Sequence, residues 1–174
     1  RRVLLYRRSL RVILAGGVFM SRLTKILLQE VPNGVYRFGS RAQADRIAEK
    51  VEDFNWQCFL LDGGAMDSKA TFLAACAKAF DLPDYFGANW DAWEETLNDL
   101  SWAPARGYIV LFDNVTAFAD RATDAWETAV DIFGMAADNW GENGKPFYVL
   151  LRKAGGYWTV DVEDVESEDD DDDD

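Results

Sequence analysis

Four short runs of residues have the character of β-strands, and a turn signal or a polar stretch follows each of them. Three of the runs are almost continuously apolar, which is typical of strands covered on both faces, as in a parallel sheet. The fourth, the first along the chain, follows the turn signal Pro-Asn-Gly. The predicted strands are residues 34–38, 58–62, 107–112 and 147–151.

Between these strands the apolar residues recur at helical spacing. Each such segment opens with a residue that can cap a helix N-terminus. The expected caps are Ser40, Asp67, Asn89 and Asp124. Strands that alternate with helices indicate an α/β fold, a small parallel sheet with helices packed on it. Residues 20–30 show only a weak pattern, and residues 157–160 fit either an added edge strand or a terminal flap.

The two ends of the chain differ in charge from its middle. Residues 1–19 hold five Arg and no acidic residue, whereas residues 161–174 hold eleven acidic residues and no basic one. Such an acidic segment is typical of a solvated, disordered tail. The expected organisation is a disordered upstream extension (1–19), an N-terminal extension with an additional strand and helix (20–57), the main domain (58–152) and the acidic tail (153–174).

Composition narrows the classes of function. The chain has 174 residues, 49% of them hydrophobic, which is enough for one buried core. The absence of His excludes His-based triads and the commonest zinc sites. The net charge of −13 argues against direct binding of nucleic acid, and no apolar run is long enough to span a membrane. Two Cys are too few for a disulfide framework, which indicates a reducing, cytoplasmic location. We expect no cofactor and no metal.

The segment from residue 82 to residue 100, LPDYFGANWDAWEETLNDL, has the most distinctive pattern. On a helix that starts after Asn89, one side is an apolar stripe made of Trp90, Trp93, Leu97 and Leu100. The other side carries Asp91, Glu94, Glu95 and Asn98. No basic residue occurs between Lys78 and Arg106, whereas six acidic residues do. The segment therefore presents a local anionic face.

A charged helix face is most often simply solvated. Here no Lys or Arg four residues away neutralises the acids, which are confined to one loop and helix beside Tyr85. That arrangement favours a surface that steers and binds a basic partner. A pair such as Asp91 and Glu95 is also the minimum for acid–base hydrolysis of glycosides. Because no second group of catalytic residues and no EF-hand-like spacing accompanies it, we expect neither an enzyme nor a calcium site.

The stretch LPDYFGANWDA (82–92) resembles the barstar family, the intracellular inhibitors of barnase-type guanyl-specific ribonucleases. The resemblance runs from Phe59 to Arg152 and includes LDG (61–63), GYIVLF, AWETAVDIF (125–133) and FYVLL in the same order. It implies a three-stranded parallel sheet packed with four helices. It also implies a monomer that blocks a ribonuclease in a one-to-one complex by covering the active site with the loop and helix of residues 82–99.

The resemblance implies roles for individual residues on this surface. The expected partner-binding residues are Tyr85, Gly87, Asn89, Asp91, Glu94, Glu95, Asn98 and Asp99. Glu95 stands where the family usually has its central inhibitory aspartate, so its carboxylate is expected in the place of a substrate phosphate. Asp91 is expected to pair with an active-site Arg or Lys, and Asn89 to cap the helix. Tyr85 would add contact area, and Glu94 would add charge at the rim.

Two departures from the family pattern affect the expected partner. Glu94 replaces an interface tryptophan, and Met135 lies near the place of a peripheral interface glutamate. These differences keep a second function open, in which the same fold serves as an immunity protein, an antitoxin or an interaction module for a different basic partner.

Overall fold

Four parallel strands form one sheet in the computed structural model, which describes residues 21–84 and 86–162. The strands are β1 (Gly34–Arg37), β2 (Gln57–Asp62), β3 (Tyr108–Asp113) and β4 (Phe147–Leu151), and they lie in the order β1-β4-β3-β2. The three-stranded sheet implied by the family resemblance was wrong by one strand, because the predicted strand at 34–38 joins the same sheet as β1. β1 pairs with β4 from Gly34 opposite Tyr148 to Arg37 opposite Leu151, which buries the apolar side chains of the strand.

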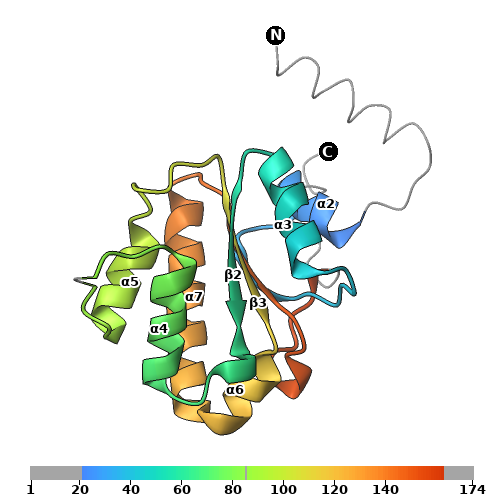
Figure 1. The fold of residues 1–174 in the computed structure, drawn as a ribbon. Helices are drawn as coiled ribbons and strands as arrows, with labels where there is room; N and C mark the ends of the chain where they lie inside the picture. The colour runs from blue at the N-terminus through green and yellow to red at the C-terminus, as the bar shows by residue number, and fades with distance from the viewer. Residues whose placement is uncertain (1–20, 85, 163–174) are drawn as a thin grey trace, which may run out of the picture.

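The sheet separates two cores, because successive strand side chains point to opposite faces. In β3, Tyr108, Val110 and Phe112 belong to one core, and Ile109 and Leu111 belong to the other. The first face is covered by α4 (Lys69–Ala79), α5 (Trp90–Asn98), α6 (Val115–Arg121) and α7 (Thr123–Glu142). The second face is covered by α2 (Arg22–Leu27) and α3 (Ala44–Asp53) (Figure 1). The α/β class predicted from the sequence is confirmed.

Helix α3 begins four residues later than its predicted cap. The Ser40 hydroxyl accepts a hydrogen bond of 3.2 Å from the Ala42 amide, so it closes a short turn and does not cap the helix. The helix itself follows Gln43, whose side chain makes no capping bond. The serine-containing pattern was therefore a turn signal, which has the same local hydrogen-bond chemistry as a cap.

Helix α4 is capped by Ser68, one residue after the predicted Asp67. Ser68 and Thr71 form a reciprocal capping box, in which each side chain bonds the backbone amide of the other. The Asp67 carboxylate accepts a hydrogen bond of 3.1 Å from the Thr71 hydroxyl, so it supports the cap from outside.

Helices α2 and α6 were not predicted, and α7 does not start as expected. Six and seven residues long, α2 and α6 are too short to show a helical period in the sequence. Helix α7 begins at Thr123, one residue before the predicted Asp124 cap, and the residue before it makes no side-chain capping bond. A single residue separates it from α6, and the two helices pack against each other.

The segment after β4 is a flap with one bridge to the sheet edge. The Arg37 amide donates to the carbonyl oxygen of Val160 at 2.7 Å, and Arg37 and Asp161 form an isolated parallel bridge. The indole Nε1 of Trp158 donates to the Val35 carbonyl at 2.9 Å. These contacts satisfy backbone groups on the outer edge of β1, which would otherwise be open to pairing.

Residues 1–20, Tyr85 and residues 163–174 lie outside the described part of the chain. The predictions for the arginine-rich start, for Tyr85 and for most of the acidic tail therefore fall on residues of which nothing is described. Among the helices of residues 21–84 and 86–162, none is long and apolar enough to cross a membrane.

Candidate functional site

Helix α5 is held against the first core by its apolar stripe. Trp93 and Leu97 are fully buried, and the Trp93 ring meets Phe80 edge-on with 4.9 Å between the ring centroids. Trp90, at the start of the helix, is half-buried against Phe72, and the Lys69 ammonium lies over its outer ring face at 5.5 Å. The predicted stripe is confirmed, and burying it turns the opposite side of α5 to solvent.

Asn89 ends the loop before α5, and its side chain forms hydrogen bonds with both the helix and the loop. Its Oδ1 accepts a hydrogen bond of 2.8 Å from the Ala92 amide and so caps the helix, as predicted. Its Nδ2 donates to the Gly87 carbonyl at 3.1 Å. A Cβ atom on Gly87 would lie 3.0 Å from that Nδ2 atom, so a larger residue there would press on the cap. Asn89 thus sets where the loop ends and where the first turn of α5 points.

Three carboxylates stand on the outer side of α5. Asp91, Glu94 and Glu95 are all exposed, and none forms an ion pair with any residue of the described ranges. Asp91 lies in the first turn, where the positive end of the helix dipole favours a negative charge. Glu94 and Glu95 lie farther along and have no such support. Since like charges at this spacing repel, this face is suited to a cation from outside the molecule.

Asn98 and Asp99, at the end of α5, are both engaged within the molecule. The half-buried Asn98 side chain donates to the Glu94 carbonyl at 2.9 Å and accepts from Asn139 Nδ2 at 2.8 Å. The Asp99 carboxylate accepts a hydrogen bond of 3.2 Å from the Ser101 amide and remains exposed. Asn98 therefore anchors the helix, while Asp99 keeps its charge available to solvent. Whether either contacts a partner stays a prediction.

Two large apolar side chains, one after the end of α5 and one on α7, are exposed. Trp102 is 44% exposed, and its Nε1 donates to the carbonyl oxygen of Phe80, the residue that follows α4, at 3.3 Å. Trp102 was not among the predicted site residues. The available signal was its position two residues after Leu100, the last apolar residue of the α5 stripe, and two residues before Pro104. Met135, on α7, is 50% exposed, and its position relative to a partner stays a prediction.

The arrangement is suited to binding cationic groups. The carboxylates are exposed on a single helix. Exposed carboxylates on a rigid helix accept hydrogen bonds from Arg or Lys of another molecule. The chemistry available is therefore charge-assisted recognition.

Comparison with known protein families identifies the fold that carries this helix. The sequence profile of the family described as Barstar (barnase inhibitor) matches residues 56–152. The chain belongs to the barstar family. The match covers β2, β3 and β4 with helices α4 to α7, so the acidic face of α5 is part of the barstar domain. Helices α2 and α3 and strand β1 lie outside the match.

Comparison with curated proteins and with solved structures adds little. No curated protein matches the chain. Among solved structures, one similar chain is the Aeropyrum pernix ORC2 protein in its ADPNP-ADP complexes, at 14% sequence identity and a TM-score of 0.48. The similarity covers 82% of this chain and 39% of that one.

Proposed function

We propose that this protein is a stoichiometric inhibitor of a ribonuclease of the barnase type. In this proposal the loop and helix of residues 82–99 cover the active site of the nuclease, and their carboxylates take the place of RNA phosphate. The observation that carries the proposal is the row of exposed carboxylates Asp91, Glu94 and Glu95, without ion pairs among the described residues, on a helix of the barstar domain.

The physical basis is the chemistry of a cleft that binds phosphate. Such a cleft is lined by Arg and Lys, and a carboxylate forms with them the same charge-assisted hydrogen bonds as a phosphate oxygen. Glu95 is assigned to the phosphate subsite, and Asp91 to a neighbouring Arg or Lys. Glu94 lies at the rim, where exposed charge contributes to the association rate more than to the strength of the complex.

The remaining residues shape the surface. Asn89 fixes the start of α5, and Gly87 lets the loop approach a partner closely. Tyr85 adds contact area, and Asp99 extends the negative charge toward the end of the helix. Asn98 holds the helix on α7 through its bond with Asn139. We assign the protein to the cytoplasm and expect it to be a monomer. There it would protect its own cell from the ribonuclease.

The experiment is a titration of a barnase-type guanyl-specific ribonuclease with the full chain, with RNA cleavage as the readout. Inhibition that is complete at one molar equivalent, together with a one-to-one complex by light scattering, is expected. A nuclease that stays fully active in excess protein would contradict this choice of partner.

A second candidate is an immunity protein or antitoxin for a basic nuclease of another kind. Glu94 and Glu95 favour it, because the family resemblance places a tryptophan and an aspartate at these positions. Each change alters the shape offered to the partner, and a longer Glu95 side chain fits a deeper or wider subsite. Binding to such a nuclease, with no inhibition of the barnase-type enzyme, would support this candidate.

A further inference from the structure

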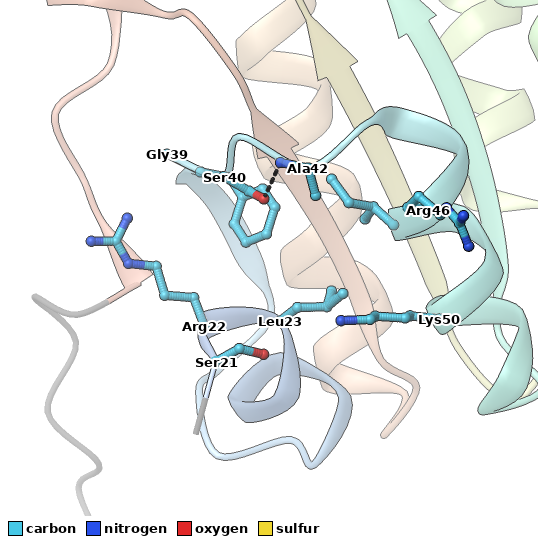
Figure 2. A pocket seen from close by; sticks show the side chains of 10 residues that line it. Ser21, Arg22, Leu23, Gly39, Ser40, Ala42, Arg46 and Lys50 are labelled. Carbon is cyan, nitrogen blue, oxygen red and sulfur yellow. Dashed lines mark hydrogen bonds between the residues drawn. The ribbon is translucent and has the colours of Figure 1, made fainter. Parts of the chain in front are cut away.

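A pocket of about 350 Å³ lies at the carboxyl end of β1, between α2, α3 and the loop that joins β1 to α3 (Figure 2). All of its lining residues fall between Ser21 and Lys50, outside the part of the chain that matches the barstar family. It belongs to the second face of the sheet, opposite α5. Carboxyl ends of parallel strands are the usual place for a binding site in α/β proteins.

The pocket combines an apolar floor with a basic rim. Leu23, Phe38 and Ile47 line it and belong to the second core. Arg22 and Lys50 lie on opposite sides of the opening, and no acidic residue is among its lining residues in the described part of the chain (Figure 2). An occupant suited to this surface has an apolar side chain flanked by carboxylates.

The C-terminal part of the chain arrives at this pocket. The Asp161 carboxylate pairs with Arg37 at 3.4 Å and with Arg22, a pocket residue, at 3.7 Å. Val162, the last described residue, is 1% exposed and packs in the same core cluster as the pocket floor. The next twelve residues read EDVESEDDDDDD, a single valine and a single serine among ten acidic residues.

We propose that residues 163–174 dock in this pocket of their own chain, with Val165 on the apolar floor. Three residues of extended chain reach about 10 Å, so Val165 can reach a pocket whose rim residue Arg22 already pairs with Asp161. The carboxylates of Glu163 and Asp164 then face the rim formed by Arg22 and Lys50. Because the segment is tethered, its effective concentration at the pocket is of the order of millimolar, which makes a weak contact sufficient.

Docking has a consequence for the acidic face of α5. It holds the acidic segment on the opposite side of the sheet and neutralises a basic patch in a protein of net charge −13. The carboxylates of α5 then remain the free anionic surface for a basic partner. The segment then acts as a part of the fold. Its composition alone would predict a solvated tail.

Carbodiimide coupling of the full chain tests the contact, because the reagent joins a lysine amine to a carboxylate only where the two touch. Peptide mass spectrometry should find Lys50 joined to Glu163 or Asp164, and about 1 M salt should abolish the product. Lys78, on α4 at the opposite face of the sheet, is the control. Absence of coupling at Lys50, or equal yields at both lysines, would overturn the proposal. So would a yield that rises with protein concentration, which would indicate a second copy.

A chain that ends at Val162 gives an independent readout that does not depend on any nuclease. This variant keeps the Asp161 ion pairs, and its methyl NMR spectrum is compared with that of the full chain and of Val165→Ser. Signals of Leu23 and Ile47 should shift in both variants, whereas those of Leu73, on the other face, should not. Identical Leu23 and Ile47 signals in all three proteins would show that the pocket is empty of this segment.

Discussion

Asn139 of α7 donates a hydrogen bond of 2.8 Å to the side-chain oxygen of Asn98 at the end of α5. One residue further along α7, Trp140 Nε1 donates to the Leu97 carbonyl at 2.8 Å. Together these bonds attach the last turn of α5 to the longest helix of the barstar domain. The carboxylates on the outer side of α5 therefore stand on a fixed support, and binding need not order the backbone that carries them.

We expect Glu95→Ala to weaken the nuclease complex by about 2–5 kcal/mol, because truncation leaves a buried cation of the partner without its counter-charge. The loss should arise mainly from faster dissociation, measured by surface plasmon resonance. Glu127→Ala is the matched control, since Glu127 is also an exposed helix carboxylate but lies on α7. Equal affinities for the Glu95 and Glu127 variants would remove Glu95 from the centre of the interface.

Association with the nuclease should slow steeply as salt rises to about 0.15 M, where the Debye length is about 8 Å. The cause is screening of the exposed carboxylates, which steer the encounter. Stopped-flow fluorescence would measure the rate. Glu94→Gln should flatten the salt dependence and leave dissociation nearly unchanged, as for a charge at the rim. An association rate that does not respond to salt would show that this face plays no part in steering.

Long periodic patterns predicted the centre of the fold well. Strands β2, β3 and β4 and the apolar stripe of α5 were predicted because a buried position requires an apolar residue, and Trp93 is fully buried. The cap at Asn89 was predicted correctly as well. The predicted cap at Ser40 was wrong, because a serine side chain can close a turn with the same kind of hydrogen bond. Pairing of β1 with β4 depends on residues more than a hundred positions apart, which local patterns do not encode.

The candidate site was only partly predictable. Exposure of Asp91 and Glu95 followed from their position opposite the stripe. The internal bonds of Asn98 did not, because they involve Asn139 from a helix 41 residues away in the sequence. The pocket beside Lys50 was missed for a similar reason. Its walls come from α2, whose six residues are too few to show a period, and from a loop.

The Cys58 thiol should be nearly inert in the folded protein. Burial, with a smaller contribution from the Glu52 charge, raises its pKa to about 12 from 9.0. A raised pKa disfavours the thiolate, so 5,5′-dithiobis(2-nitrobenzoate) should label a Cys76→Ala variant slowly at pH 8 and rapidly after unfolding in urea. The unfolded chain ionises at the lower pKa, so this thiol's contribution to stability is complete below pH 9 and is lost as the pH rises toward 12. Rapid labelling of the folded variant would contradict the burial of Cys58.

Two glycines of the barstar domain should respond in opposite ways to the same substitution. A Cβ atom on Gly63 would lie 2.5 Å from the carbonyl oxygen of Asn114, a backbone atom that cannot move aside cheaply. Nearby, hydrogen bonds from Asn114 and from the Gly64 amide lower the pKa of Asp62, so the same shift would disturb that pairing. Gly63→Ala should therefore lower the free energy of unfolding by about 1–3 kcal/mol.

Gly134, within α7, has no atom within 4 Å of the place a Cβ would take, apart from its chain neighbours and the backbone of its own helix. Gly134→Ala should therefore raise the free energy of unfolding, by up to about 1 kcal/mol, because alanine restricts the unfolded chain and favours the helix. Urea unfolding of both variants would measure the two effects under one condition. If Gly63→Ala were as stable as Gly134→Ala, the end of β2 would not lie as close to Asn114 as the fold requires, and the loop that leads to α4 would have to be placed differently.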